Sequence, residues 1–339
     1  MNIKDVANCA GVSISTVSRV INNTAKVSED ARKRVEAVLK ETGYRPNSLA
    51  RELQQNKTYT IGVLICVTEL SMSSLSQSIN AITDVLKANN YNIMLANSRY
   101  HADEELSIFN TFKEKRVDGI LYFAAGFAKK HYAMLKNYKI PIVMIGQKSN
   151  YIDMPYVIHD DFYAAKTATE YLIQMGHQDI GFIGLPDYDE AAGLERKKGY
   201  KLAHEMNNIP LNPSRMTEGD FSIESGYEAM KILLKNPDDR PTAVFATTDF
   251  MAIGAISCAN EMGLKVPDDI SVMGFDDVHV AAFYQPPLTT IHTDTHAVST
   301  KAAELLLSLM DKENPNKITK YVASYSLMER GSVRPLSSI

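Results

Sequence analysis

The sequence IKDVANCAGVSISTVSRVIN, residues 3–22, decides the organisation of the N-terminal part of the chain. Apolar residues of its first half recur at helical spacing on one face: Val6, Ala7 and Ala10. Gly11 interrupts this pattern and supplies the backbone freedom of a tight turn, and Ser13 is a suitable N-cap for a second helix. The second helix has its own apolar face, made of Val17, Val20 and Ile21. This stretch therefore predicts two short helices joined by a turn.

The other sides of the second helix carry mostly hydrogen-bonding side chains and one cation. They are Ile14, Ser15, Thr16, Ser18, Arg19 and Asn22. Because an Arg can pair with both acceptors of guanine and hydroxyl groups reach bases or phosphates, such a face suits the major groove of DNA. We predict that these six residues and Ser13 contact DNA. A helical bundle with an ordinary solvated basic face is the alternative.

A third helix is expected from Ser28, a suitable N-cap, to Thr42, with Gly43 as its C-terminal stop. Three short helices of this kind can share one small core.

Charge is distributed unevenly along the chain. The net charge of −4 argues against nucleic-acid binding only if it is spread evenly. Residues 1–60 hold ten Lys and Arg against six Asp and Glu, a balance of +4, whereas the other 279 residues hold 26 against 34. The N-terminal segment is therefore basic, as expected for a segment that contacts phosphates.

These motifs together resemble a known family. The runs KDVA at 4–7, AGVS at 10–13 and TVSRVIN at 16–22 look like the N-terminal signature of the lactose/galactose repressor family (LacI/GalR) of bacterial transcription regulators. The resemblance implies a homodimeric repressor that binds double-stranded operator DNA and responds allosterically to a small-molecule effector, a sugar or sugar derivative. No cofactor is implied.

Residues 43–53, GYRPNSLAREL, resemble the linker and hinge helix of that family. Pro46 stops the preceding helix and Asn47 can cap a new one, although so short a helix is marginal alone. The resemblance assigns DNA contacts to Asn47, Ala50 and Leu53, with Leu53 as the side chain wedged between base steps of the minor groove. A lone apolar linker residue is the alternative for Leu53.

From residue 60 onward, short apolar runs alternate with amphipathic stretches, the pattern of parallel βαβ units. Strands are expected at 60–67, 91–97, 117–124, 140–146, 179–185, 242–247, 270–275 and 289–293. Helices are expected at 76–89, 102–115, 162–175, 190–207, 223–235 and 250–262. Since this number of strands exceeds what one compact sheet of this length usually holds, we expect two lobes.

The core also resembles that of the family, which is similar to periplasmic sugar-binding proteins with two doubly wound parallel sheets. Matching phrases include GDFS at 219–222, TDFMAIG at 248–254 and VMGFDD at 272–277. The expected domains are a helix-turn-helix domain at 1–45, a hinge helix and linker at 46–59, and an effector-binding core at 60–339. The resemblance divides the core into one lobe at 60–160 and 293–320 and a second at 161–290 and 321–339.

Open α/β sheets bind ligands beyond the carboxyl ends of their strands. Asp276 follows an expected strand and can accept from sugar hydroxyls, and Arg196 can donate several hydrogen bonds. Both align with effector-contacting positions of the family, and a structural ion pair is the alternative for them.

Three further residues are effector-binding candidates. Phe221 aligns with an aromatic position that suits the C–H face of a pyranose or a planar base, or else it packs in the core. Asp249 contacts the effector or caps the helix that follows it. His159 lines the pocket or is structural. Departures from the common family pattern at Gln147 and Thr248 prevent any transfer of effector identity.

The sequence does not support an enzymatic function. The chain has no G-x-S-x-G nucleophile elbow, P-loop, G-x-G-x-x-G turn or H-E-x-x-H motif, and its eight His show no metal-site spacing. No run approaches the roughly 18 apolar residues of a membrane helix, and the N-terminus offers no apolar export signal. We therefore expect a cytoplasmic regulator without catalytic or metal-binding residues.

Overall fold

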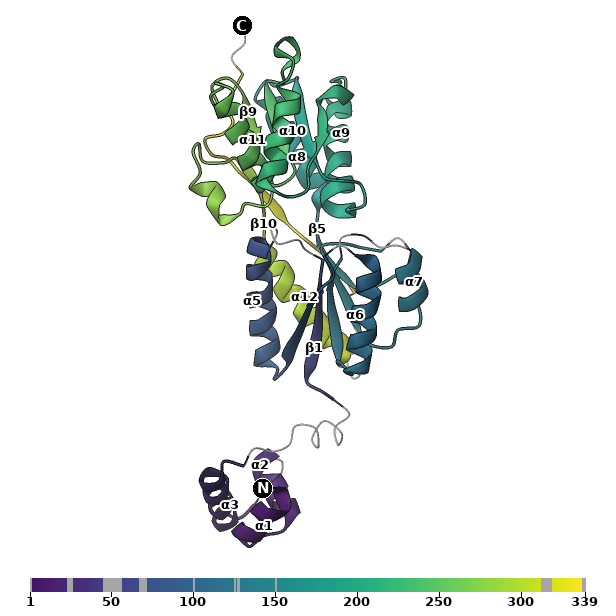
Figure 1. The fold of residues 1–339 in the computed structure, drawn as a ribbon, viewed down its shortest axis with the longest axis vertical. Helices are drawn as coiled ribbons and strands as arrows, with labels where there is room; N and C mark the ends of the chain where they lie inside the picture. The colour runs from purple at the N-terminus through teal and green to yellow at the C-terminus, as the bar shows by residue number, and fades with distance from the viewer. Residues whose placement is uncertain are drawn as a thin grey trace. The chain divides into compact units, whose positions relative to one another are not determined.

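The structure, a computed structural model, describes residues 2–22, 27–44, 57–66, 72–99, 101–124, 126, 129–149, 151–311 and 319–336. The chain divides into two compact units, residues 1–58 and residues 59–339 (Figure 1). Among the described residues, no helix is both long and apolar enough to cross a membrane.

The N-terminal unit contains three helices. They are α1 (Ile3–Ala10), α2 (Ile14–Asn22) and α3 (Glu29–Thr42). Gly11 ends α1 with a φ of 60° and Gly43 ends α3 with a φ of 61°, a left-handed conformation that favours glycine. Ser28 caps α3 by accepting from the backbone N–H of Ala31. The three helices predicted from the sequence are thus confirmed, and they enclose one core made of Val6, Ala7, Ala10, Val17, Val20 and Val35.

The first lobe of the core unit is built on a six-stranded parallel sheet in the order β11-β5-β4-β3-β1-β2. Its strands are β1 (Thr60–Ile65), β2 (Asn92–Asn97), β3 (Gly119–Phe123), β4 (Ile142–Ile145), β5 (Tyr156–His159) and β11 (Lys320–Ala323). Its helices are α5 (Met72–Ala88), α6 (Ala102–Glu114), α7 (Lys129–Leu135) and α12 (Thr295–Met310).

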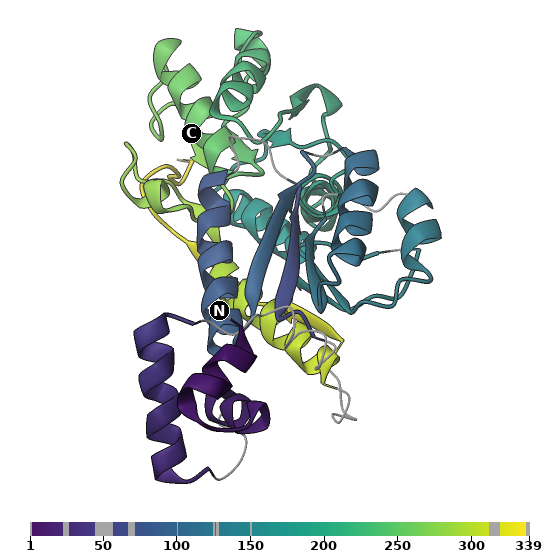
Figure 2. The ribbon, with the colours of Figure 1, turned by 60° about the horizontal axis from the view of Figure 1, so that its bottom comes forward.

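Helices cover both faces of this sheet, so β1 buries side chains on both sides. Ile61 and Val63 face a cluster with α5 and α12, whereas Leu64 faces a cluster with α6 and α7. Helices α5 and α12 lie side by side, although more than 200 residues separate them in the sequence (Figure 2).

The second lobe is built on a four-stranded parallel sheet in the order β7-β6-β8-β9. Its strands are β6 (Ile180–Gly184), β7 (Met216–Glu218), β8 (Ala243–Ala246) and β9 (Ser271–Met273). Its helices are α8 (Asp161–Gln174), α9 (Arg196–Met206), α10 (Ile223–Leu233) and α11 (Asp249–Glu261). Short helical turns lie at η2 (Glu190–Glu195), η3 (Pro213–Arg215), η4 (Pro237–Asp239) and η5 (His279–Ala282). Helices α10 and α11 cover one face, and α8 and α9 cover the other.

The chain passes between the lobes three times, each time through one residue. Asp160 connects β5 to α8, and Asp294 connects β10 (Thr290–Thr293) to α12. Ser324 connects β11 to β12 (Tyr325–Met328). Two of these residues cap the helix that follows, because Asp160 accepts from the N–H of Tyr163 and Asp294 from that of Ala297. Strand β12 pairs with β10 in an antiparallel ribbon.

The expected assignment of 321–339 to the second lobe is wrong in one respect, because this segment takes part in two strands that belong to different sheets. Strand β11 pairs with β5 in the sheet of the first lobe, whereas β12 pairs with β10. The C-terminal segment therefore contributes to both lobes, and the expected assignment of 321–323 to the second lobe does not match the sheet.

Other elements also differ from expectation, among them α7 and α12, which were not among the expected helices. Strand β5 was not predicted because Val157 is its only fully buried residue, and β7 was not predicted because it is a short edge strand without a buried residue. The single helix expected at 190–207 begins with the π-helical turn η2 and continues as α9 from Arg196. At η2 a Cβ on Gly193 would collide with the carbonyl oxygen of Pro186, so the backbone there needs glycine.

Candidate functional site

Five of the predicted DNA-contacting residues, Ile14, Ser15, Thr16, Ser18 and Arg19, lie on the outer side of α2, and Ser13 directly precedes this helix. Ser13, Ile14, Ser15 and Arg19 are exposed, and Thr16 and Ser18 are half-buried. Ile14 is 42% exposed, which is unusual for an isoleucine in so small a unit. In contrast, Val17 and Val20 of the same helix are buried in the core. Helix α2 therefore presents its polar side outward because its apolar side holds the unit together.

The start of α2 is fixed by hydroxyl groups. Ser13 Oγ accepts from the backbone N–H of Thr16 at 3.2 Å and lies 2.8 Å from Ser15 Oγ and 2.9 Å from Thr16 Oγ1. Arg19 makes no hydrogen bond or ion pair with any residue that the structure describes, so its guanidinium is available to another molecule. Helix α2 also includes Asn22, but the side chain of Asn22 lies outside the description, as do Asn47, Ala50 and Leu53.

A cavity of about 260 Å³ lies between the two lobes of the core unit. Its lining includes residues at or just beyond the carboxyl ends of strands from both lobes: Cys66, Ala124, Gly146, His159, Asp189, Phe221, Asp276 and Thr293. This is the place where parallel α/β sheets bind ligands. Four of the five predicted effector-binding residues line the cavity, namely Arg196, Asp276, Phe221 and His159.

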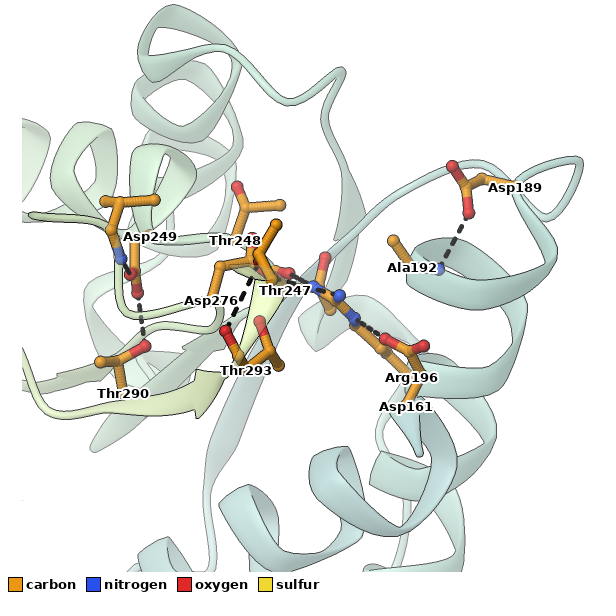
Figure 3. A network of polar contacts seen from close by, with 12 residues as sticks. Asp161, Asp189, Ala192, Arg196, Thr247, Thr248, Asp249, Asp276, Thr290 and Thr293 are labelled. Carbon is orange, nitrogen blue, oxygen red and sulfur yellow. Dashed lines mark hydrogen bonds and ion pairs between the residues drawn. The ribbon is translucent and has the colours of Figure 1, made fainter. Parts of the chain in front are cut away.

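Arg196 is the central cation of this cavity, and its side chain is held on every side (Figure 3). Its Nε donates to Asp161 Oδ1 at 2.8 Å, and its Nη1 donates to the carbonyl oxygen of Thr247 at 2.5 Å. Its Nη2 lies 3.2 Å from Asp276 Oδ1. The guanidinium carbon is 3.6 Å from the centroid of the Phe275 ring, a cation–π contact. Only 6% of Arg196 is exposed, so its position is fixed before any ligand arrives.

Asp276 has an unusual backbone and a half-buried carboxyl group. Its φ is 104°, a conformation that L residues rarely adopt and that tends to persist at functional sites. Burial raises the pKa of the Asp276 carboxyl to about 6, although the neighbouring Arg196 works in the opposite direction. The side chain retains 31% exposure and lines the cavity, so it can accept hydrogen bonds from a ligand.

Phe221 contributes an apolar ring to the wall of the cavity, and His159 contributes an imidazole ring. Phe221 also has a positive φ, 73°, and packs partly against the core of the second lobe while it lines the cavity. His159 Nδ1 is buried and has no hydrogen-bond partner among the described residues. Burial lowers the pKa of His159, so the ring is neutral at pH 7.

Asp249 is the predicted residue that does not line the cavity. Its Oδ2 accepts from the backbone N–H of Val278 at 2.8 Å, and its Oδ1 accepts from Thr290 Oγ1 at 2.5 Å. Thr248, and not Asp249, is the N-cap of α11. Burial and the charge of Asp276 raise the pKa of Asp249 well above its ordinary value. In Figure 3, Asp249 and Thr290 form a pair separate from Arg196 and Asp161.

Two carboxylates of the cavity were missed by sequence reasoning. Asp161 follows β5, which the sequence did not predict, and Asp189 lies beyond the end of β6. Asp189 Oδ1 accepts from the N–H of Ala192 at 2.9 Å and from Gln147 Nε2 at 3.0 Å. Because Gln147 follows β4, this second hydrogen bond joins the two lobes. The rule that ligands bind at carboxyl ends of strands would have found Asp189, since the preceding strand was predicted.

The chain is similar to known transcription regulators. Residues 2–47 match the bacterial regulatory proteins of the lacI family, and residues 169–333 match the periplasmic binding protein-like domain. The chain is 38% identical to the HTH-type transcriptional repressor PurR of Photorhabdus laumondii over 335 residues, which cover 98% of this chain and 96% of that protein.

Two solved structures share the fold over nearly the whole length. The Lac repressor dimer bound to operator and the anti-inducer ONPF matches with a TM-score of 0.89 at 28% identity, covering 98% of this chain and 99% of that chain. The complex of the transcriptional regulator CelR with cellobiose matches with a TM-score of 0.75 at 28% identity and the same coverage. This chain belongs to the lacI family of bacterial regulatory proteins, DNA-binding transcription regulators that are not enzymes.

Proposed function

We propose that this chain is a homodimeric repressor that binds a pseudo-palindromic operator through α2 and is controlled by a sugar-like effector in the cavity between its lobes. The observation that carries the effector assignment is the arrangement of Arg196 and Asp276. Both line a cavity at the carboxyl ends of strands, and the carboxylate and guanidinium are held rigidly at 3.2 Å. Paired acceptors and donors of this kind suit the adjacent hydroxyl groups of a sugar.

Phe221 supports the same class of ligand. Its ring lines the cavity, and an aromatic face packs well against the C–H groups of a pyranose. The CelR relative is described as a complex with cellobiose, a sugar. A planar base would also stack on Phe221, so a nucleobase is an alternative outcome of the binding experiment.

DNA recognition is proposed to involve two copies of α2 on one two-fold axis. Ser13, Ile14, Ser15, Thr16, Ser18, Arg19 and Asn22 would contact the major groove. Asn47, Ala50 and Leu53 would contact the central minor groove, as the family resemblance implies. The Lac repressor relative is described as a dimer bound to operator, which supports the homodimer.

The experiment is a selection from random duplex DNA with the full chain, followed by mobility-shift titration of the enriched sequence. We expect an inverted repeat. Adding a panel of monosaccharides, disaccharides and nucleobases should then identify a molecule that changes operator affinity, with a coupling of about 1 to 3 kcal/mol. Enrichment of sequences without two-fold symmetry would contradict the dimeric arrangement, and a response to nucleobases alone would replace the sugar.

A further inference from the structure

The walls of the cavity carry more negative than positive charge. Among the described lining residues, three are carboxylates (Asp161, Asp189 and Asp276) and one is a guanidinium (Arg196). His159 adds no charge, because burial lowers its pKa and keeps the ring neutral. A ligand that enters this cavity therefore meets an excess of negative charge.

Arg196 cannot balance this excess for all three carboxylates. Three of its N–H groups are engaged by Asp161, the Thr247 carbonyl and Asp276, of the five that a guanidinium offers. Its charge is therefore compensated by two carboxylates of the protein itself. An anionic ligand would have to compete with these internal partners for Arg196.

Asp189 is the one of these three carboxylates that forms no ion pair with Arg196. Only 6% of it is exposed, and within the described part of the chain it forms no ion pair. Two N–H donors, from Gln147 and Ala192, both point at its Oδ1, so Oδ2 has no hydrogen-bond donor among the described residues. Burying an unpaired carboxylate is unfavourable, and burial raises the pKa of Asp189 to about 6, although the nearby charge of Arg196 and the hydrogen bonds from Ala192 and Gln147 work in the opposite direction.

A neighbouring cavity of about 390 Å³ does not change this balance. It shares Gln147, His159 and Asp161 with the first cavity. Its described lining contains two lysines, Lys148 and Lys198, against four carboxylates. One of the lysines, Lys198, already pairs with Glu195 at 2.7 Å. Molecules approaching from this side therefore also pass acidic walls.

We propose that the effector carries a protonated amine that pairs with Asp189 in the cavity between the lobes, an inference that rests on the proposed effector role of that cavity. The ammonium group supplies the counter-charge that the protein does not, and its N–H groups satisfy Asp189 Oδ2. The hydroxyl groups of the same molecule bond to Asp276 and to the remaining donors of Arg196. Amino sugars are the chemical class that combines these groups, and sugar phosphates are disfavoured by the same charges.

The test is calorimetric titration of the full chain at pH 7.0 with matched sugars. The probes are glucose, galactose and mannose, their 2-amino-2-deoxy forms, the N-acetyl derivatives of these amines, and glucose 6-phosphate. We expect at least one amino sugar to bind about tenfold or more tightly than both its parent and its N-acetyl derivative. The N-acetyl derivatives separate the effect of charge from that of the extra substituent.

The charge dependence is tested with Asp189→Asn. Asparagine can still accept from Ala192 and Gln147 and is a good helix cap, so the variant should fold and lose only the charge. The preference for the amine should then fall to about threefold or less. Asp187→Asn is the matched control, because Asp187 is 60% exposed, pairs with Lys197 and does not line the cavity. This control should retain the full preference.

Three results would overturn the inference: amines that bind no better than their parent sugars, no binding of any amine, or a preference that survives in Asp189→Asn. Operator binding is measured on the same preparation, so that a failure of the amine inference can be distinguished from a failure of the proposed function. A chain that binds operator and responds to a neutral sugar retains the proposed function and loses the amine. A chain that binds amines through Asp189 but binds no operator retains the amine inference and loses the proposed function.

Discussion

Asp161 Oδ1 lies 2.8 Å from Arg196 Nε, so the first residue of α8 holds the first residue of α9. These two helices come from segments on either side of β6, and both begin at the cavity. The ion pair therefore links the geometry of the cavity to the packing of the second lobe. It also explains why Arg196 is rigid without a ligand.

Replacing Arg196 with lysine should abolish the effector response and spare operator binding. A lysine keeps the charge, but one ammonium group cannot reach Asp161, the Thr247 carbonyl and Asp276 together. We expect effector affinity to fall by about 1.5 to 3 kcal/mol, measured by calorimetry, with operator affinity in mobility shifts unchanged. Arg215→Lys is the control, because Arg215 also pairs with two carboxylates, Asp179 and Asp239, but does not line the cavity. An effector response that persists in Arg196→Lys would remove Arg196 from the binding site.

Arg19→Ala should weaken operator binding without affecting the effector. Arg19 is exposed on α2 and has no partner among the residues described, so its loss should not disturb the fold. A lost base contact costs about 1 to 3 kcal/mol. Arg34→Ala removes the same charge from α3, where Arg34 pairs with Asp30, and should have a smaller effect on specific affinity. Equal losses in the two variants would indicate general phosphate attraction in place of base recognition.

Asp189→Asn should stabilise the chain above pH 6. Because burial raises the pKa of Asp189 to about 6, the folded chain binds this proton more tightly than the unfolded chain does. Ionisation therefore destabilises the fold, and the penalty develops as pH rises from about 4 to about 6. We expect the variant to gain about 1 to 3 kcal/mol in the free energy of unfolding above that interval.

Urea titrations at several pH values measure this difference. Asp276, whose pKa is also raised to about 6, titrates in both proteins, but the charge of Asp189 contributes to that rise, so the contribution of Asp276 cancels only in part. Equal stability of variant and parent from pH 4 to pH 8 would show that Asp189 is satisfied without a ligand.

Glu105→Gln should destabilise the first lobe. Burial alone would raise the pKa of Glu105, but hydrogen bonds from His131 and Tyr122 outweigh it and hold the pKa below its usual value. The folded chain thus binds this proton less tightly than the unfolded chain does. The resulting stability is present above the ordinary pKa, 4.5, and is lost as pH falls through the lower pKa of the folded state.

At pH 7 the expected loss is about 1.5 to 3 kcal/mol, the value of hydrogen bonds to a charged group, measured by urea unfolding. Glu104→Gln changes the adjacent, exposed glutamate and should have no comparable effect. Similar stability in the two variants would mean that the buried carboxylate contributes nothing.

Leu53→Ala tests the hinge assignment, which lies outside the described residues. If Leu53 is wedged between base steps, specific operator affinity should fall by about 1 to 3 kcal/mol while nonspecific binding persists. Mobility shifts on operator and random DNA measure both. Equal losses on the two DNAs would argue against a wedge.

Local signals made the N-terminal unit predictable. Gly11, Ser13 and Ser28 act within one helical turn of their own positions, through a positive φ or a side-chain cap. Both partners of each such interaction lie within one short stretch of sequence, so a sequence pattern can reveal them. The third helix, expected from its cap Ser28 to Thr42, therefore matches the observed helix Glu29–Thr42.

The cavity was only partly predictable because its partners are distant in sequence. The strand-end rule found Asp276 and the family resemblance found Phe221, but neither gave the direction of Asp249, which Val278 and Thr290 fix from far along the chain. It also missed Asp161, since β5 has too little buried surface to produce a strand pattern.

The three single-residue connections at Asp160, Asp294 and Ser324 have a mechanical consequence. Two bodies joined by one strand can twist, bend and slide independently, whereas three connections side by side suppress most of these freedoms. The lobes should therefore move along one principal angle. A molecule that bridges the lobes should therefore act by opening or closing that angle, so a single interlobe distance should report the state of the core unit.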